Sequence, residues 1–223
     1  MLPSFTIDMT HVRTELCMIG EIVGADKSPY NTVNHRHPYT GFYASAFAPL
    51  QNRACRFAEI GIAGGRSAHL WNAFFRHPEA QIYMFDRDAD FVKHAKEELL
   101  QVPGGHRFTF DLMDVSVDGD VSTSFERGFA ATKELFDVII DDSSHEFDHQ
   151  IRICKEALPY IRQGGLLIIE DVFRATSEQK YFDALSAAGV LRECSFAYFV
   201  ICEHENRWSP GWDNDKLLVL VKG

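Results

Sequence analysis

The sequence predicts an α/β protein built on a doubly wound, mostly parallel sheet of seven strands. From residue 56 onward, short apolar runs alternate with segments of helical periodicity, which is the pattern of a parallel sheet with helices on both faces. The last two apolar runs, 194–203 and 216–222, are separated by a polar stretch without helical spacing. We therefore expect these two strands to pair antiparallel with each other.

Five predicted strands precede that pair, and each is followed by a predicted helix. The apolar runs predict strands at 56–62, 81–86, 107–113, 136–141 and 166–171. The helices are predicted at 65–75, 88–101, 121–132, 146–160 and 176–188. The run 136–141 is almost continuously apolar, as in a parallel strand that is covered on both faces. The helix over 146–160 should end at the following "QGG", where glycine can adopt the left-handed C-cap conformation, and the last helix at Gly189.

Composition and charge exclude several classes of protein. With 46% hydrophobic residues and 18 Phe among 223 residues, the chain can bury a sizeable core. A net charge of −10 opposes a generic nucleic-acid binder, which needs Lys and Arg to replace phosphate counterions. No apolar run reaches the roughly 18–20 residues that cross a bilayer, and the N-terminus lacks the basic and apolar regions of a signal peptide. We therefore expect a cytoplasmic protein that binds neither nucleic acid nor membrane.

The cysteines indicate reduced thiols. They are odd in number, widely spaced and form no C-x-x-C pair: Cys17, Cys55, Cys154, Cys194 and Cys202. This pattern predicts neither a disulfide framework nor a zinc site.

A glycine-rich turn, "EIGIAGGRS", follows the first predicted strand and opens a helix. Glycines allow a tight turn and a close approach of a ligand to the backbone, beside the free N–H groups at the helix start. The dinucleotide pattern G-x-G-x-x-G would need glycines at 63 and 66, where the chain has Ala63 and Arg66. The pattern E-x-G-x-(G/A)-x-G fits instead, through Glu59, Gly61, Ala63 and Gly65.

This turn resembles the first motif of class I S-adenosylmethionine-dependent methyltransferases. The resemblance implies that the turn, together with Ser67, lies against the amino-acid part of the cofactor. Asp86 ends the second strand, where a carboxylate can accept both ribose hydroxyls. Asp111 and Asp114 end the third strand, near the place where the family reads adenine. Because acids stand at successive strand ends, we favour a role in binding a nucleoside cofactor over the alternative that they are solvated loop residues.

We expect the chain to divide into an N-terminal segment and a cofactor-binding domain. Residues 1–50 are less regular than the rest, and 24–43, rich in Tyr, His and Asn, is predicted to be a loop. The segment 1–50 is expected to contribute loop and helix that cover the active site. Residues 51–223 are expected to form the S-adenosylmethionine-binding methyltransferase domain.

Acidic side chains end the fourth and fifth predicted strands, Asp141-Asp142 in one and Glu170-Asp171 in the other. If these strands are neighbours, up to four carboxylates converge beyond their carboxyl ends. When carboxylates lie so close together, their mutual repulsion must be offset by bound protons or by a cation. A hard divalent ion such as Mg²⁺, which prefers oxygen ligands, is the natural candidate. The sequence therefore predicts a metal at the edge of the cofactor site.

His145 follows Asp142 by three residues, at the start of the next helix. A neutral imidazole can accept a proton near pH 7, and a metal makes a bound hydroxyl more acidic. We therefore expect His145 to deprotonate a substrate hydroxyl, whose oxygen then attacks the cofactor methyl group. Because the sulfonium leaves as a neutral thioether, no nucleophilic side chain is needed.

The same stretch, "FDVIIDDSSHEFDHQ", resembles the D-D-(G/S)-S-H-x-x-x-H-Q motif of metal-dependent sugar O-methyltransferases of the macrolide and macrocin types. Their G-T-D-K and H-x-Y-x-x-x-Y segments are matched upstream by Gly24, Asp26, Lys27, His37, Tyr39 and Tyr43. The resemblance, over roughly residues 24–175, implies His145 as the general base, with Asp142 beside it. It also implies Asp142, Glu170 and Asp171 at the metal and Asp141 at the cofactor. Ala25 and "DLMD" (111–114) depart from the family pattern.

The resemblance also implies a place in natural product biosynthesis. The expected partner is a small-molecule hydroxyl acceptor, a sugar or a glycoside, and self-assembly into a homo-oligomer is left open. Trp208 and Trp212, in the loop that joins the last two strands, either line the acceptor pocket or hold that loop in place. For His149, a structural role is favoured over a zinc pair with His145.

Three other functions remain open at this point. A methyltransferase could keep the cofactor and use the acids for substrate hydrogen bonds without a metal. A nicotinamide-dependent oxidoreductase is disfavoured by Arg66 in place of the third glycine. A non-catalytic S-adenosylmethionine-binding protein would have no evident need of His145 and its acids.

Overall fold

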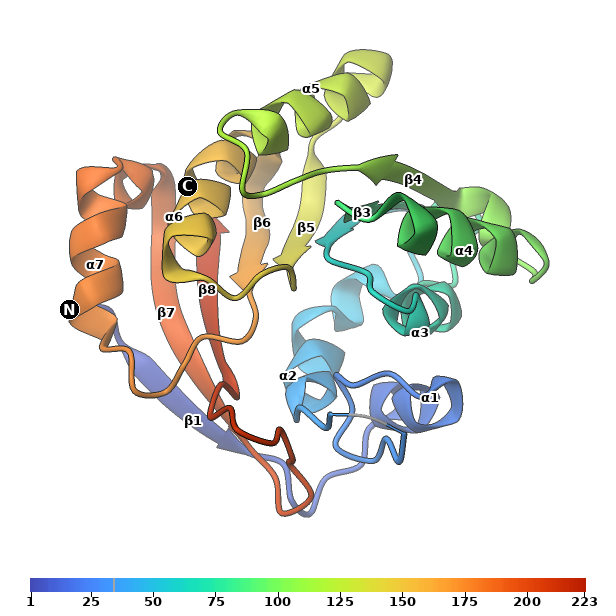
Figure 1. Cartoon of the computed structure of the whole chain (residues 1–223), viewed down its shortest axis with the longest axis horizontal. Helices are drawn as coiled ribbons and strands as arrows, with labels where there is room; N and C mark the ends of the chain where they lie inside the picture. The colour runs from blue at the N-terminus through green and yellow to red at the C-terminus, as the bar shows by residue number, and fades with distance from the viewer. Residues whose placement is uncertain (34) are drawn as a thin grey trace.

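The structure, a computed structural model, describes residues 1–33 and 35–223 and forms one eight-stranded sheet with helices on both faces (Figure 1). In spatial order the strands are β1 (Ser4–Asp8), β7 (Cys194–Glu203), β8 (Lys216–Lys222), β6 (Ile161–Ile169), β5 (Phe136–Asp141), β2 (Arg56–Ile60), β3 (Gln81–Asp86) and β4 (Phe108–Leu112). β8 runs antiparallel to both of its neighbours, whereas all other neighbouring strands are parallel. The predicted fold class and the antiparallel C-terminal pair are confirmed.

Helices cover the two faces of the sheet in separate groups. One face packs against α1 (Glu15–Val23), α2 (Tyr39–Ala46), α3 (Arg66–Phe74) and α4 (Ala89–Leu100). The other face packs against α5 (Asp120–Thr132), α6 (Phe147–Ala157) and α7 (Glu178–Ala187). The helices predicted from residue 65 onward are confirmed, with ends shifted by a few residues. None of the helices in the described part of the chain is long and apolar enough to cross a bilayer.

The N-terminal 50 residues are more regular than predicted. β1 adds an eighth strand at the edge of the sheet, parallel to β7, so the predicted count of seven strands is wrong. The prediction of a loop over 24–43 is wrong at its end, because Tyr39 begins α2. β1 has one neighbour and is mostly exposed, and α2 carries a glycine and aromatic residues without an amphipathic stripe. Neither element therefore gives a periodic signal.

The glycines after α6 lie inside a strand and do not cap the helix. α6 ends at Ala157, and a short 3-10 turn, Leu158–Tyr160, leads directly into β6. Gly164 has φ +73°, and Gly165 has no room for a Cβ, which would lie 2.9 Å from the carbonyl oxygen of Asp137. The register between β5 and β6 shifts in this region. The glycines thus permit an irregularity in the pairing of the strand, and the predicted C-cap is wrong.

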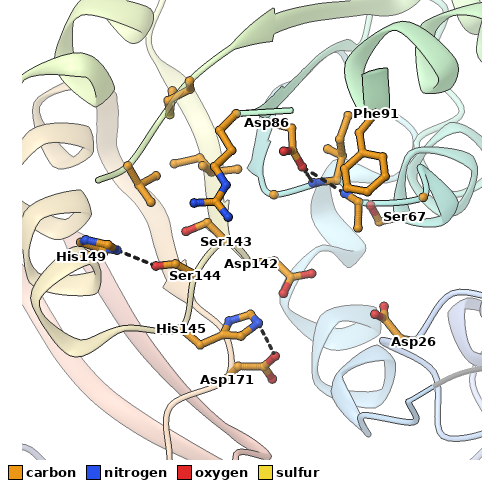
Figure 2. Close-up of a pocket in the computed structure, with 18 of the residues that line it drawn as sticks. Asp26, Ser67, Asp86, Phe91, Asp142, Ser143, Ser144, His145, His149 and Asp171 are labelled. Atoms are coloured by element: carbon orange, nitrogen blue, oxygen red, sulfur yellow. Dashed lines mark hydrogen bonds and ion pairs between the residues drawn. The ribbon is translucent and has the colours of Figure 1, made fainter. Parts of the chain in front are cut away.

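The strand order places the polar strand ends together. The chain adds β3 and β4 on one side of β2 and β5 and β6 on the other, so the direction of winding reverses between β2 and β5. In open α/β sheets this reversal leaves a crevice beyond the carboxyl ends of the strands. Asp86, Asp142 and Asp171, which follow three different strands, face this crevice (Figure 2).

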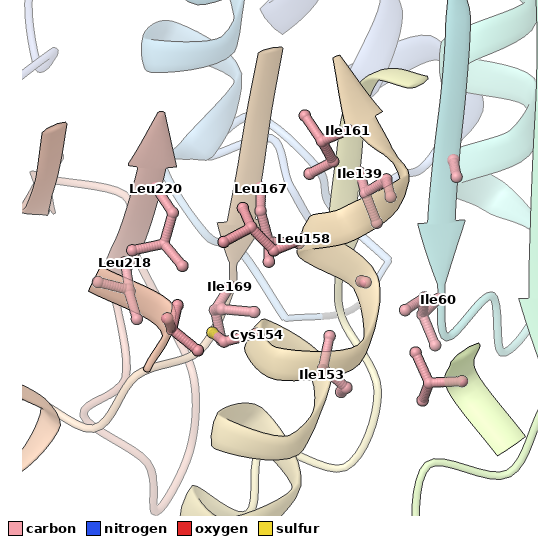
Figure 3. Close-up of a cluster of buried hydrophobic side chains, with 14 of the residues drawn as sticks. Ile60, Ile139, Ile153, Cys154, Leu158, Ile161, Leu167, Ile169, Leu218 and Leu220 are labelled. Atoms are coloured by element: carbon pink, nitrogen blue, oxygen red, sulfur yellow. The ribbon is translucent and has the colours of Figure 1, made fainter. Parts of the chain in front are cut away.

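Two apolar layers hold those strand ends in position. On one face, Ile153 and Cys154 of α6 pack against Leu167 and Ile169 of β6 (Figure 3). On the other face, Trp71 of α3 is fully buried among aromatic rings of α2 and β2. Dense packing of this kind resists displacement, so the loops at the carboxyl edge stand on a rigid support.

Candidate active site

A cavity of about 500 Å³ lies beyond the carboxyl ends of β2, β3, β4 and β5 (Figure 2). Its walls come from the glycine turn after β2, the ends of β3 and β4, and the turn after β5. Asp26, His37, Asp171 and Trp212 close the remaining side. The volume falls within the range of roughly 300–1,000 Å³ that is typical of small-molecule sites.

The glycine turn approaches the backbone of the turn after β5 closely. Gly61 has φ +90°, and a Cβ at this position would lie 2.0 Å from the carbonyl oxygen of Asp142. The N–H of Asp142 donates to the carbonyl of Ile60 over 2.8 Å. Only glycine fits here, both for its backbone conformation and for the space. Gly65, at φ +74°, is the N-cap residue before α3 and does not line the cavity.

Of the predicted cofactor residues on β3 and β4, one lines the cavity and the other does not. Asp86 lines the cavity, and its Oδ2 accepts from the backbone N–H groups of Ile62 (2.9 Å) and Ala63 (3.1 Å). It therefore ties the glycine turn to the end of β3. Asp111 lies outside the lining and forms an ion pair with Arg127 at 3.0 Å. At the end of β4 it is Asp114 that reaches the cavity.

Lys27 places a buried ammonium group among three carboxylates. Its side chain is 1% exposed, and Nζ lies 3.0 Å from Glu59 and 2.7 Å from Glu170, in contact also with Asp142. Burial alone would lower the pKa of Lys27, but these carboxylates outweigh it and raise the pKa well above its ordinary value. The cation that the acid cluster requires is thus supplied by the chain itself.

Two members of this cluster lie outside the cavity lining. Glu59, predicted at the cofactor, also accepts from the indole Nε1 of Trp71 at 2.9 Å. Glu170, predicted at the metal, accepts from the Tyr43 hydroxyl at 2.6 Å through Oε1 and from Lys27 through Oε2. Burial raises the pKa of Glu170 to about 7; Lys27 opposes this, whereas the carboxylates of Glu59 and Asp171 add to it.

Asp141 is buried behind the cavity. Its Oδ1 accepts from the hydroxyl of Ser143 at 2.6 Å and from the Ser143 N–H at 3.2 Å. Burial raises the pKa of Asp141 to about 7, against these hydrogen bonds. The structure places this predicted cofactor residue under the turn that carries Asp142, outside the cavity lining. Ser67, by contrast, lines the cavity.

Asp142, His145 and Asp171 come together at the cavity wall (Figure 2). Among the residues that the structure describes, these three form a group whose potential metal-ligand atoms all lie within 4.8 Å of one another. His145 Nε2 is 3.4 Å from Oδ2 of Asp171. Burial lowers the pKa of His145 below its ordinary value, although Asp171 opposes this, which favours the neutral form of the imidazole.

The backbone at these positions is unusual. His145 has φ +58° and Asp171 has φ +56°, a region that residues other than glycine seldom occupy. Such conformations persist only where surrounding contacts enforce them, and they are concentrated at functional sites. Here both residues follow strand ends that the sheet fixes, and their side chains are turned toward each other.

Asp171 is held from its other side by residues of the N-terminal segment. The Tyr39 hydroxyl donates to Asp171 Oδ1 over 2.5 Å, and His37 Nδ1 lies 3.6 Å from the same oxygen. His37 also lies 2.9 Å from Asp215 and stacks on Tyr39. Burial opposes a charge on His37, but the carboxylates of Asp171 and Asp215 outweigh it and raise its pKa to about 9.

Several lining residues carried no sequence signal strong enough to assign them. Asp26 and His37 match the family motif and lie in the segment that was expected to cover the active site, but no local pattern assigned either of them a role. His149 lines the cavity and lies 2.8 Å from the hydroxyl of Ser144, which agrees with a structural role. Within the described residues it is not part of the potential metal group.

Comparisons with known proteins add a family and a fold. The sequence model of a family described as a methyltransferase domain matches residues 58–172, about half of the chain. The chain is 30% identical over 146 residues to 8-demethyl-8-(2-methoxy-alpha-L-rhamnosyl)-tetracenomycin-C 3'-O-methyltransferase of Streptomyces olivaceus, covering 62% of this chain and 33% of that protein. It is 31% identical over 147 residues to demethylmacrocin O-methyltransferase of Streptomyces fradiae, with coverage of 62% and 33%.

Among solved structures, the fold resembles the MycE methyltransferase from the mycinamycin biosynthetic pathway, in complex with Mg and SAH. The TM-score is 0.67 at 21% identity, covering 95% of this chain and 55% of that one. This likeness supports the Rossmann-like methyltransferase fold. The chain spans about a third of the length of the two curated relatives.

Replacement of Lys27 by Met should destabilise the protein by about 3–5 kcal/mol, because it leaves buried carboxylates without a counter-charge. Without the ammonium these acids bind protons more tightly in the folded than in the unfolded chain. Their folded-state pKa is then raised, so stability is retained at low pH and lost as the pH rises through that pKa. We therefore expect a larger loss at about pH 8 than at about pH 5, measured by urea unfolding.

The matched control is Lys155→Met, which removes an exposed lysine of α6. It should change the free energy of unfolding by less than about 0.5 kcal/mol at either pH. Equal losses for the two variants would contradict the role given to Lys27.

Proposed function

Because the chain belongs to the methyltransferase domain family that its residues 58–172 match, we propose that it is an S-adenosylmethionine-dependent O-methyltransferase. The proposed acceptor is a hydroxyl of a sugar or a glycosylated small molecule. The observation that carries the proposal is the pairing of His145 with Asp171 at the wall of the cavity of about 500 Å³. Such a pair can accept a proton from a hydroxyl that enters the cavity.

The residues around the cavity suit the cofactor. Gly61 and Ala63 would allow close approach of its amino-acid part, and Asp86 and Asp114 present carboxylates for its polar groups. When bound, S-adenosylmethionine supplies a methyl group on a sulfonium, which is transferred to the acceptor oxygen with release of a neutral thioether. Asp111 and Asp141 stay predictions as cofactor residues, because both lie outside the lining.

The donor set also suits a hard divalent cation such as Mg²⁺. Lys27 contacts Oδ2 of Asp142, which leaves Oδ1 of that acid as a potential ligand, and Asp171 faces the same group through Oδ2, 3.4 Å from His145 Nε2. A cation held there would make a nearby hydroxyl more acidic. Glu170, the third ligand that the resemblance implies, stays a prediction, because it lies outside the cavity lining.

We assign proton transfer to His145 and not metal ligation, because hard divalent ions prefer oxygen ligands. Burial keeps the ring neutral, and Asp171 would stabilise the imidazolium that forms when the ring takes the acceptor proton. Tyr39 and His37 hold Asp171 in this orientation. Asp142 lies in the same group and would help to place the acceptor hydroxyl.

The sugar class rests on the curated relative from Streptomyces olivaceus, whose name describes an O-methyltransferase of a rhamnosyl compound. This supports natural product biosynthesis as the setting. One observation favours a second candidate, a methyltransferase that works without a metal: Lys27 already supplies a cation to three of the acids.

Wild-type protein should bind S-adenosylhomocysteine with a Kd of tens of micromolar or lower, on the order of −6 kcal/mol or better by calorimetry. Gly64→Leu should weaken this binding by at least about tenfold, because Gly64 lines the cavity and its Cβ position faces open space. Gly64→Ala, the matched control, should have a much smaller effect. Unchanged thermal unfolding would confirm that both variants fold, and absence of binding to the wild type would overturn the proposal.

His145→Gln should lower kcat by about 100-fold or more while the Kd for S-adenosylhomocysteine stays unchanged, since the ring is proposed to move a proton. Because the pKa of His145 is lowered from 6.5, the wild-type rate should stay level down to that pH and fall below it. His69→Gln is the control, since its ring is similarly buried (21% exposed, against 17% for His145) but lies outside the cavity. Full activity of His145→Gln would exclude it as the base.

A further inference from the structure

A second cavity, of about 490 Å³, opens directly beside His145. It shares four residues with the first cavity: Ser144, His145, Glu146 and Trp212. The residues that it adds are Phe147, Asp148, Phe173 and Lys180. The proposed base therefore lines two adjoining cavities, one with the glycine turn and one with aromatic and charged side chains. An acceptor that reaches His145 can occupy the second while the cofactor occupies the first.

Trp212 is the aromatic residue common to both cavities. Its ring centroid lies 5.6 Å from that of His145 at 76° and 6.2 Å from that of Phe173 at 61°. The side chain is nevertheless 46% exposed. A large aromatic side chain that is both held in place and open to a cavity is the usual form of a binding contact, because it offers area at little cost in conformational entropy.

A neighbouring tryptophan provides an internal comparison. Trp208 lies in the same loop and is equally exposed, at 48%. It pairs with Arg36 across a backbone bridge, and the Arg36 guanidinium lies 5.6 Å from its ring centroid. It lines neither cavity. The two residues thus differ in place and not in exposure, so anchoring of the loop can be assigned to Trp208 and ligand contact to Trp212.

We propose that Trp212 is the platform on which the sugar ring of the acceptor stacks, with Phe173 contacting an apolar aglycone. This inference rests on the proposed function and names the residues that select its substrate. One face of a sugar ring presents C–H groups with partial positive charge, which the negative face of an indole ring attracts. Stacking on a ring this close to His145 would place the sugar hydroxyls within reach of the base.

The polar rim of the second cavity supports a sugar over a purely apolar ligand. Glu146 and Asp148 offer hydrogen-bond acceptors, and Lys180 offers a donor, beside the aromatic surface. Polar groups placed beside an apolar surface fix the orientation of a small ligand. Phe173, Lys180 and Trp212 also follow residue 172, where the match to the family ends. Acceptor choice would therefore belong to segments outside the common domain.

The test measures binding of rhamnosides, because rhamnose is the sugar in the name of one relative. The probes are octyl α-L-rhamnoside, methyl α-L-rhamnoside and 1-octanol, titrated below micelle concentration into protein saturated with S-adenosylhomocysteine. The proteins are wild type, Trp212→Ala and the matched control Trp208→Ala. We expect octyl rhamnoside to bind the wild type more tightly than either other probe. Trp212→Ala should weaken it by about tenfold, and Trp208→Ala by less than about twofold.

Trp208→Ala should bind S-adenosylhomocysteine within about twofold of the wild type, and each rhamnoside titration uses enough S-adenosylhomocysteine to saturate the protein that is tested. Unchanged octyl rhamnoside binding by Trp212→Ala would overturn the inference. So would octanol binding as tight as that of octyl rhamnoside, or no rhamnoside binding by a wild type that binds S-adenosylhomocysteine. A wild type that fails to bind S-adenosylhomocysteine would contradict the proposed function itself, so the two failures are distinguishable.

Discussion

The site depends on one buried cation, the ammonium group of Lys27 among the carboxylates of Glu59, Asp142 and Glu170. Each of these charges would be costly to bury alone, and removal of the cation leaves an excess of negative charge in the protein interior. The contact also joins the segment between α1 and α2 to the ends of β2, β5 and β6. The N-terminal segment and the sheet therefore form one wall of the site.

This arrangement divides the acids into two groups. Glu59 and Glu170 face Lys27, Trp71 and Tyr43 and lie outside the cavity lining. Asp142 and Asp171 line the cavity beside His145. The first group fixes the strand ends and the second is available for chemistry. The left-handed backbone at His145 and Asp171 is tolerable because both follow strands whose ends are held by the sheet.

The sequence predicts features that depend on residues close together in the chain, and it does not predict features that depend on distant residues. Periodicity located the strands and helices from residue 56 onward, and acids after β5 and β6 predicted that Asp142, His145 and Asp171 would meet. β1 could not be predicted, because an exposed edge strand has no apolar alternation. Lys27 could not be assigned either, since its partners Asp142 and Glu170 lie 115 and 143 residues away along the chain. Burial of Asp141 and Glu170 likewise depends on tertiary packing.

The most direct test of the role of Lys27 is a crystal structure of the protein with S-adenosylhomocysteine and Mg²⁺ at saturating concentration. We predict that the Lys27 ammonium group keeps its contacts with Glu59 and Glu170 while the ion is ligated by Asp142 and Asp171. A structure with the ion in the position of the ammonium group, and the Lys27 side chain turned away from the acids, would contradict the account.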